Sequence, residues 1–219
     1  MKTNLRIVAM VAIASLLLQL AACAARPRWR GDEGAAYDVL NRSTMALLEL
    51  DPEVLAGPFG SALRQACAVF VFPGHVQGAP ASAATRGDGV LLVRDRSTGH
   101  WSGPVFYALR RAGADGGELP DGRGRVIVAG CGALRRLADA ASASPPALDD
   151  ATLADMTAWT LSPRRADPVP LRAIDLRPLP VLSLAFYQAP ASLSAITLDR
   201  TVRNDASGEI LAVIERAAH

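Results

Sequence analysis

The sequence predicts an α+β domain built on a mostly antiparallel, barrel-like or strongly twisted sheet that is flanked by helices. Helical periodicity appears near both ends of the chain, and several short runs of β-branched and aromatic residues, bounded by Gly and Pro, lie between them. Strands that follow one another through turns pair antiparallel. Residues 35–219 are enough for one domain with its own core, whereas residues 1–34 differ in character.

The first half of the domain combines helices with a predicted hairpin. A helix is expected over residues 32–50, with Asp32 as its N-cap, and a second, short one over residues 59–67. Residues 69–72 are an apolar, β-favouring run that Pro73 ends. Residues 95–99 have the composition of a tight turn, so strands at 90–94 and 101–109 should pair antiparallel. Residues 75–88 are expected to be a loop or a weak strand, and residues 112–124 are expected to be a loop.

The second half begins with a predicted strand at 125–129 and a helix at 133–141. A further helix is expected over residues 150–161, with Trp159 in it, and residues 163–170 are expected to be irregular. Three strands follow at 171–176, 181–187 and 193–198, with their prolines confined to the ends. Asn204 or Asp205 should cap a last helix that runs through residue 218.

The N-terminus predicts an export signal in residues 1–22. Lys2 and Arg6 precede an apolar run of about 14 residues, which is shorter than the roughly 20 residues that span a bilayer as a helix. Leu20-Ala21-Ala22-Cys23 ends the run and resembles the lipobox of bacterial lipoproteins. The resemblance implies cleavage after Ala22, acylation of Cys23 and attachment to the cell envelope. Because no aspartate follows the cysteine, it also implies the outer membrane.

Residues 23–34 are expected to form a lipidated tether. Three arginines, at positions 26, 28 and 30, surround Trp29, so the segment either meets lipid headgroups or is a solvated linker. Removing Lys2 and Arg6 with the signal from the 23 basic residues leaves as many basic as acidic residues, 21 of each. A neutral chain of this kind argues against nucleic acid as a partner.

Cysteine and histidine patterns give no catalytic or metal-binding motif. Cys67 and Cys131 either form a disulfide, as an exported protein permits, or are buried free cysteines. The three histidines, at positions 75, 100 and 219, are isolated and lack the spacing of metal ligands. We therefore expect no enzyme activity, no metal and no cofactor.

Three segments together resemble the SYLF family of lipid-binding domains: residues 68–73, residues 87–107 and, more weakly, residues 195–205. The resemblance implies a lipid-binding α+β domain over most of residues 35–215. The chain departs from the family at residues 77–84, which lack its glycine-rich stretch, and at residues 187–193, which lack its basic run. Residue-level ligand contacts therefore do not carry over.

The candidate ligand-binding residues lie at the predicted hairpin. Arg94, Arg96 and Trp101 place two guanidinium groups and an indole near one turn, a combination that suits a phosphate or lipid headgroup. The alternative is a solvated turn, with Asp95 neutralising the arginines and Trp101 in the core. The expected function is non-catalytic binding of lipid or another envelope component. A scaffold for an envelope protein, without a lipid ligand, remains the alternative.

Overall fold

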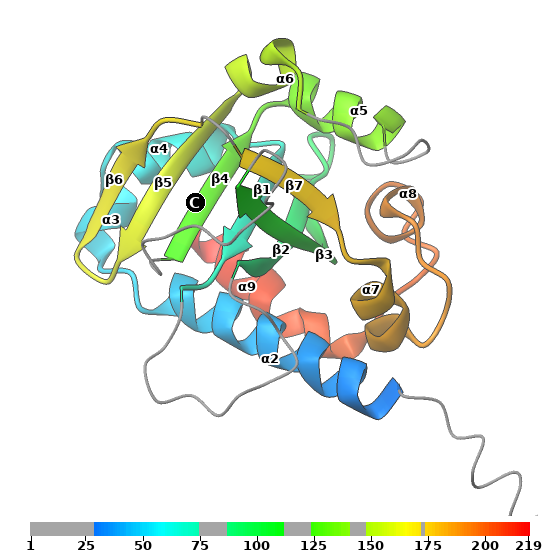
Figure 1. The fold of residues 1–219 in the computed structure, drawn as a ribbon. Coiled ribbons are helices and arrows are strands. Elements are labelled where there is room, and N and C mark those ends of the chain that lie inside the picture. The colour runs from blue at the N-terminus through cyan, green and yellow to red at the C-terminus, as the bar shows by residue number, and fades with distance from the viewer. Residues whose placement is uncertain (1–28, 75–86, 112–123, 141–147, 172–173) are drawn as a thin grey trace, which may run out of the picture.

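The computed structural model describes residues 29–74, 87–111, 124–140, 148–171 and 174–219 (Figure 1). The predicted signal peptide, Cys23 and most of the two predicted loops lie outside these residues. Within them, seven strands form one sheet with helices around it. No helix in this part of the chain has the length and apolar character needed to cross a bilayer.

Each strand of the sheet pairs antiparallel with its neighbours, in the order β6-β5-β4-β1-β2-β3-β7. The strands are β1 (Ala68–Phe72), β2 (Asp88–Arg94), β3 (Trp101–Arg111), β4 (Gly124–Ala129), β5 (Met156–Ser162), β6 (Arg165–Val169) and β7 (Ile174–Pro178). The predicted α+β class and antiparallel pairing are confirmed. The sheet is open, however, so the barrel-like form of the prediction is wrong: β6 and β7 are edge strands.

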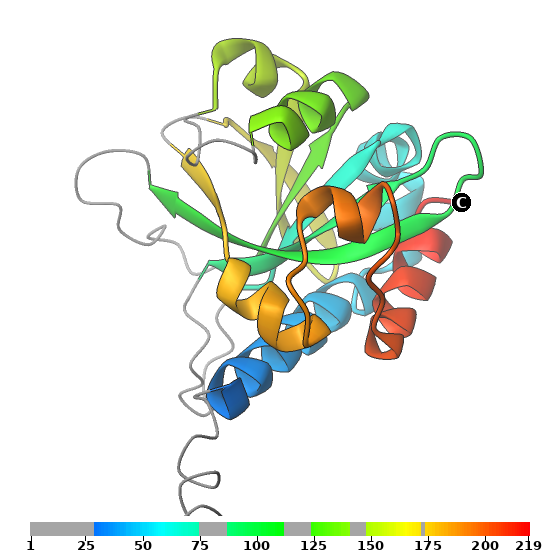
Figure 2. The same cartoon turned by 90° about the vertical axis from the view of Figure 1, so that its right-hand side faces the viewer.

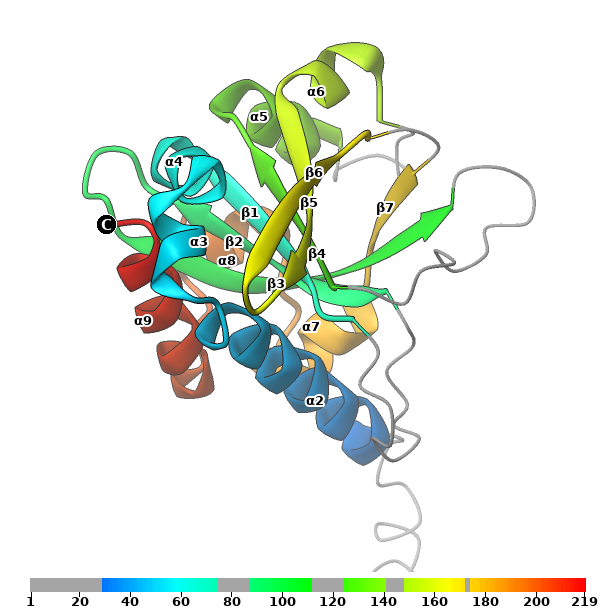
Figure 3. The same cartoon turned by 90° about the vertical axis from the view of Figure 1, so that its left-hand side faces the viewer.

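The chain connectivity explains why the sheet nevertheless curves. β6 and β7 lie at opposite edges, but only residues 170–173 join them. Such a connection reaches at most about 18 Å, whereas the edges of a flat sheet of this width would lie roughly 29 Å apart. The sheet must therefore bend until its two edges approach each other at this end, which is the curvature seen in Figures 1 and 3.

Helices cover the sheet in two groups. α2 (Trp29–Leu48) packs on β1 and β2, and α7 (Pro180–Tyr187) and α9 (Gly208–Ala217) pack beside it (Figure 3). α5 (Cys131–Ala140) and α6 (Asp150–Ala154) pack on each other next to β4 and β5. The remaining elements are α3 (Pro52–Ala56), α4 (Pro58–Gln65), α8 (Leu193–Thr197), which lies on β3, and the 3-10 turn η1 (Asp205–Ser207) (Figure 2).

Aromatic contacts connect these layers. Phe70 meets Tyr107 edge to face across the sheet, with ring centroids 5.2 Å apart. Phe186 of α7 contacts Tyr37 of α2 and Phe106 of β3 in the same manner. Such contacts add to the stabilisation from apolar burial, which is the main force that holds a core of this kind together.

Most predicted elements up to residue 140 are confirmed, with shifted ends. β1, the β2–β3 hairpin, β4 and α5 lie where the sequence predicts them. Asn204, predicted to cap the last helix, caps η1 instead, and α9 follows from Gly208 to Ala217. The first helix begins earlier than predicted, at Trp29, within the segment assigned to the tether, so Asp32 lies in its first turn and is not its N-cap. The short helix predicted at 59–67 is α4, which ends at Gln65 and is preceded by α3.

The predicted helix at 150–161 is wrong after its first turn. Asp149 caps α6, accepting a hydrogen bond from the Thr152 backbone, but the chain leaves the helix at Asp155 and continues as β5. β5 pairs with β4 from Met156 to Leu161. The β-favouring residues Thr157, Trp159 and Thr160 suit this pairing. Residues 165–169, predicted irregular, form β6, where Pro168 is tolerated because the strand lies at an edge.

Two predicted strands in the second half are helices. Residues 181–187 form α7, which starts with Pro180 in its first turn, and residues 193–197 form α8, which Ser192 caps through the Ala195 backbone N–H. An apolar run of this length does not distinguish a buried helix from a buried strand. The strand predicted at 171–176 is shifted to β7.

Candidate functional site

The β2–β3 hairpin carries the residues that the sequence singles out. The Asp95 backbone N–H donates to the His100 carbonyl at 2.9 Å, and the Gly99 N–H donates to the Asp95 carbonyl at 2.7 Å. Gly99 has a φ of +78°, which glycine adopts more easily than other residues. The turn therefore holds Arg94 and Trp101 side by side as a cross-strand pair at the end of the hairpin.

The structure brings Arg94 and Trp101 together, but the guanidinium of Arg94 is engaged by other parts of the protein. The Arg94 Nε donates to the Gly99 carbonyl at 3.2 Å, and its Nη1 donates to the Arg64 carbonyl at 2.9 Å. Its guanidinium lies 5.9 Å from the centre of the Trp101 ring, which is buried. Arg96 donates to the Gln65 carbonyl at 3.2 Å. Both arginines thus bind the last carbonyls of α4, where a cation interacts favourably with the helix end.

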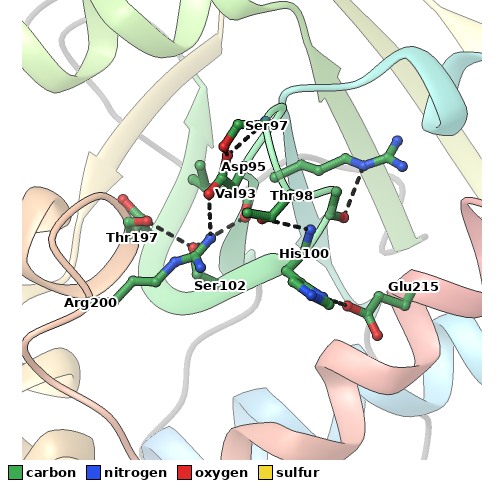
Figure 4. Close-up of polar contacts among 11 residues, drawn as sticks. Val93, Asp95, Ser97, Thr98, His100, Ser102, Thr197, Arg200 and Glu215 are labelled. Atoms are coloured by element: carbon green, nitrogen blue, oxygen red, sulfur yellow. Dashed lines mark hydrogen bonds and ion pairs between the residues drawn. The ribbon is translucent and has the colours of Figure 1, made fainter.

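Asp95 organises the tip of the hairpin (Figure 4). Its carboxylate accepts hydrogen bonds from the Ser97 hydroxyl at 2.6 Å and from the Ser97 backbone at 2.8 Å. These two bonds lower the pKa of Asp95 from 3.8 to about 2. Arg200, from the loop after α8, lies 3.4 Å from the same carboxylate and joins that loop to the hairpin.

Two further contacts attach the hairpin to helices (Figure 4). The Ser102 hydroxyl lies 3.2 Å from the Val93 carbonyl and 3.0 Å from the Thr197 carbonyl, at the end of α8. His100 Nδ1 lies 3.2 Å from Glu215 Oε1 on α9. The hairpin therefore contacts α4, α8 and α9, and most of its polar groups are engaged within the protein.

A small pocket of about 360 Å³ opens beside the hairpin, between Trp101 and the start of α9. Its polar lining consists of Ser102, Arg200, Arg203, Asn204, Asp205 and Ser207, and Leu211 is among its apolar residues. Arg203 is exposed and makes no ion pair with the described residues. The guanidinium of Arg203 is therefore accessible, whereas those of Arg94 and Arg96 donate to carbonyls of α4, but the carboxylate of Asp205 lines the same pocket.

A larger cleft lies elsewhere, between α2 and the β5–β6 hairpin, and has a volume of about 810 Å³. Its apolar wall consists of Met45, Ala46, Leu161, Pro73 and Pro163. Its polar residues are Asn41, Arg42, Glu49, Thr160, Ser162, Arg165 and Asp167. Both cations of its lining are paired, Arg42 with Asp38 at 3.1 Å and Arg165 with Asp167. The cleft is therefore apolar with a balanced polar rim.

Sequence reasoning missed this cleft. Its one visible signal was Met45, an apolar residue off the helix face formed by Val39 and Leu47, which is half exposed in the structure (50 %). The opposite wall comes from β5 and β6, in a segment for which the sequence predicted helix and irregular structure. The cleft could therefore not be predicted from the sequence, because one of its walls consists of strands that were not predicted.

Cys67 and Cys131 form a disulfide, with their Cα atoms 5.0 Å apart. It joins the residue before β1 to the first residue of α5, and the Cys67 backbone N–H also donates to the Ala129 carbonyl at 3.0 Å. Among the described residues, no three His, Cys, Asp or Glu side chains lie close enough together to hold a metal ion.

Comparisons with known proteins add no relative: no family model, no curated protein and no solved structure matched the chain. Its function is therefore argued from its own residues.

Proposed function

We propose that the protein is a lipid-anchored protein of the bacterial envelope, held in the outer membrane through Cys23, whose SYLF-like domain binds an amphipathic molecule without catalysis. The anchor rests on the short apolar run and the Leu20-Ala21-Ala22-Cys23 ending. Two or three acyl chains bind a membrane far more firmly than one, so no spanning helix is needed. The domain assignment rests on the three segments that resemble the SYLF family.

The α2/β5–β6 cleft is the observation that carries the binding function. Its volume of about 810 Å³ lies in the range of ligand pockets, and it combines apolar walls with a few polar groups at the rim. Because the arginines at the rim are paired with carboxylates, a strongly anionic ligand is not favoured. A lipid chain against Met45 and Leu161, with its headgroup toward the polar rim, matches this distribution.

Native mass spectrometry of a soluble form that starts after Cys23 tests this function. The protein is incubated with vesicles of phosphatidylethanolamine and phosphatidylglycerol, separated from them and sprayed under native conditions. We expect bound lipid on the wild type and on Leu48→Glu, and none on Met45→Glu. Met45 lines the cleft, whereas Leu48 is similarly exposed on the same helix but is not a lining residue. A wild-type protein that carries no lipid would contradict the proposal.

A scaffold for another envelope protein is the second candidate. It is favoured by the hairpin, where Arg94 and Arg96 donate to carbonyls of α4 and so have fewer free donors for a headgroup. It is also favoured by residues 187–193, which carry no charge. Cross-linking of the membrane-bound protein in intact cells would give a specific adduct under this function, and only self or lipid adducts under the first.

A further inference from the structure

The segment from Leu179 to Leu198 contains no Asp, Glu, Lys or Arg. It forms α7, the following turn and α8, which pack inward through buried residues such as Leu182, Phe186 and Ile196. Its outward residues are Pro180, Val181, Gln188, Pro190, Ser192 and Leu198, which we call the α7–α8 surface. This part of the protein exterior is therefore uncharged.

The α7–α8 surface also displays large apolar side chains. Four large hydrophobic residues are exposed in the described part of the chain, and two of them, Val181 and Leu198, belong to this surface, each 57 % exposed. The other two, Met45 and Leu48, lie on the second half of α2. Exposed apolar side chains on an uncharged surface are typical of contact with a partner or a membrane.

The position of the proposed anchor favours a membrane, over a partner protein, as the occupant of this surface. α2 begins at Trp29, six residues after Cys23, so the chain between them reaches at most about 20 Å. The N-terminal half of α2 packs on α7, where the rings of Tyr37 and Phe186 are 5.4 Å apart. Figures 1 and 2 show the start of α2 on the same side of the molecule as α7. An acylated Cys23 would hold this end near the bilayer.

We propose that the α7–α8 surface lies on the bilayer that holds Cys23, with Val181 and Leu198 in the headgroup region. This inference rests on the proposed anchor and adds an orientation to it. With this surface on the lipid, the second half of α2 is removed from the membrane, because α2 runs toward the opposite side of the molecule and a helix of 20 residues is about 30 Å long.

Spin labels test the orientation in the full, acylated protein reconstituted into vesicles of phosphatidylethanolamine and phosphatidylglycerol. Single cysteines replace Val181, Leu198 or Leu48 and are labelled with a nitroxide. With Cys67 and Cys131 bonded to each other and Cys23 acylated, each new cysteine is the only free thiol. Leu48→Cys is the matched control, since Leu48 is 43 % exposed at the far end of α2.

We expect labels at positions 181 and 198 to lose accessibility to a water-soluble nickel complex several-fold on reconstitution and to gain accessibility to oxygen, while the label at position 48 stays accessible to nickel. Equal nickel accessibility at all three positions, in protein that floats with the vesicles, would overturn the orientation and assign the surface to a protein partner. Protein that does not float would overturn the anchor as well, so the two failures are distinguishable.

Discussion

The guanidinium of Arg94 donates a hydrogen bond to the Arg64 carbonyl, with Nη1 2.9 Å from the oxygen. The two positions are 30 apart in the chain. The bond joins the β2–β3 hairpin to the C-terminal end of α4, where helix carbonyls lack partners within the helix. Arg94 is thus part of the internal structure of the domain, whatever the hairpin binds.

Replacing Arg94 should therefore lower stability. Arg94→Gln loses the bonds to Arg64 and Gly99 and the contact with Trp101, so we expect a loss of about 1 to 2 kcal/mol in the free energy of unfolding. Arg96→Gln is the control: Arg96 is exposed and makes one bond to Gln65, so its loss should stay within about 0.5 kcal/mol. Urea unfolding measures the free energy of unfolding of both variants. Equal losses for Arg94→Gln and Arg96→Gln would contradict the larger structural role of Arg94.

Leu92 tests the buried sheet. It lies in β2, opposite Val69 of β1, and is fully buried. Leu92→Ala should cost roughly 2 to 5 kcal/mol, because it removes packed methyl groups and leaves a cavity. Leu48→Ala, at an exposed position on α2, should change stability little. A loss below about 1 kcal/mol for Leu92→Ala in denaturant melts would place that side chain outside a packed core.

The Cys67–Cys131 disulfide should stabilise the domain. The two residues are 64 positions apart, and closing a loop of this size in the unfolded chain contributes roughly 2 to 4 kcal/mol. We expect a reducing agent to shift the urea midpoint of the wild type downward and to leave that of Cys131→Ala unchanged. Thiol titration of the unfolded, unreduced protein checks the bond itself: reactive Cys67 and Cys131 would show that it is absent.

Asp95 should make stability depend on acid pH. Its pKa is lowered in the folded protein from 3.8 to about 2, because the Ser97 hydroxyl and backbone donate to the carboxylate. A carboxylate with a lowered pKa stabilises the folded state above its ordinary pKa, and this contribution is lost as the pH falls through the folded value. The loss is therefore expected between about pH 4 and pH 2.

Asp95→Asn isolates this effect, since the amide can still form the turn but does not titrate. We expect urea midpoints of the wild type to fall more steeply than those of Asp95→Asn in this pH range. If the urea midpoints of the two proteins change in parallel with pH, the ionised carboxylate of Asp95 does not stabilise the folded state.

Local signals in the sequence were sufficient for the central part of the sheet. The Val-Phe-Val-Phe run of β1 consists of residues that favour strands, and the segment between β2 and β3 consists of residues that favour turns. They failed where an apolar run fits two structures. Residues 181–187 suit a strand by composition, but Pro180 starts a helix that packs between α2 and β3, and this packing is not local in the sequence.

The candidate site was predictable only in its residue types. The sequence placed Arg94 and Trp101 at one turn, and they meet there. It could not show that α4, a distant segment, supplies carbonyls to both arginines, nor that β5 and β6 form a wall opposite Met45. Contacts between remote segments decide which polar groups stay available for a ligand.

Lipid attachment at Cys23 is the central claim, and the intact mass of the protein extracted from membranes tests it most directly. The account predicts a chain that begins at Cys23 and carries the added mass of a diacylglycerol and an N-terminal acyl group, and it predicts that Cys23→Ala is released from the membrane. A chain that begins at Cys23 without added acyl mass, or a Cys23→Ala protein retained in the membrane like the wild type, would contradict it.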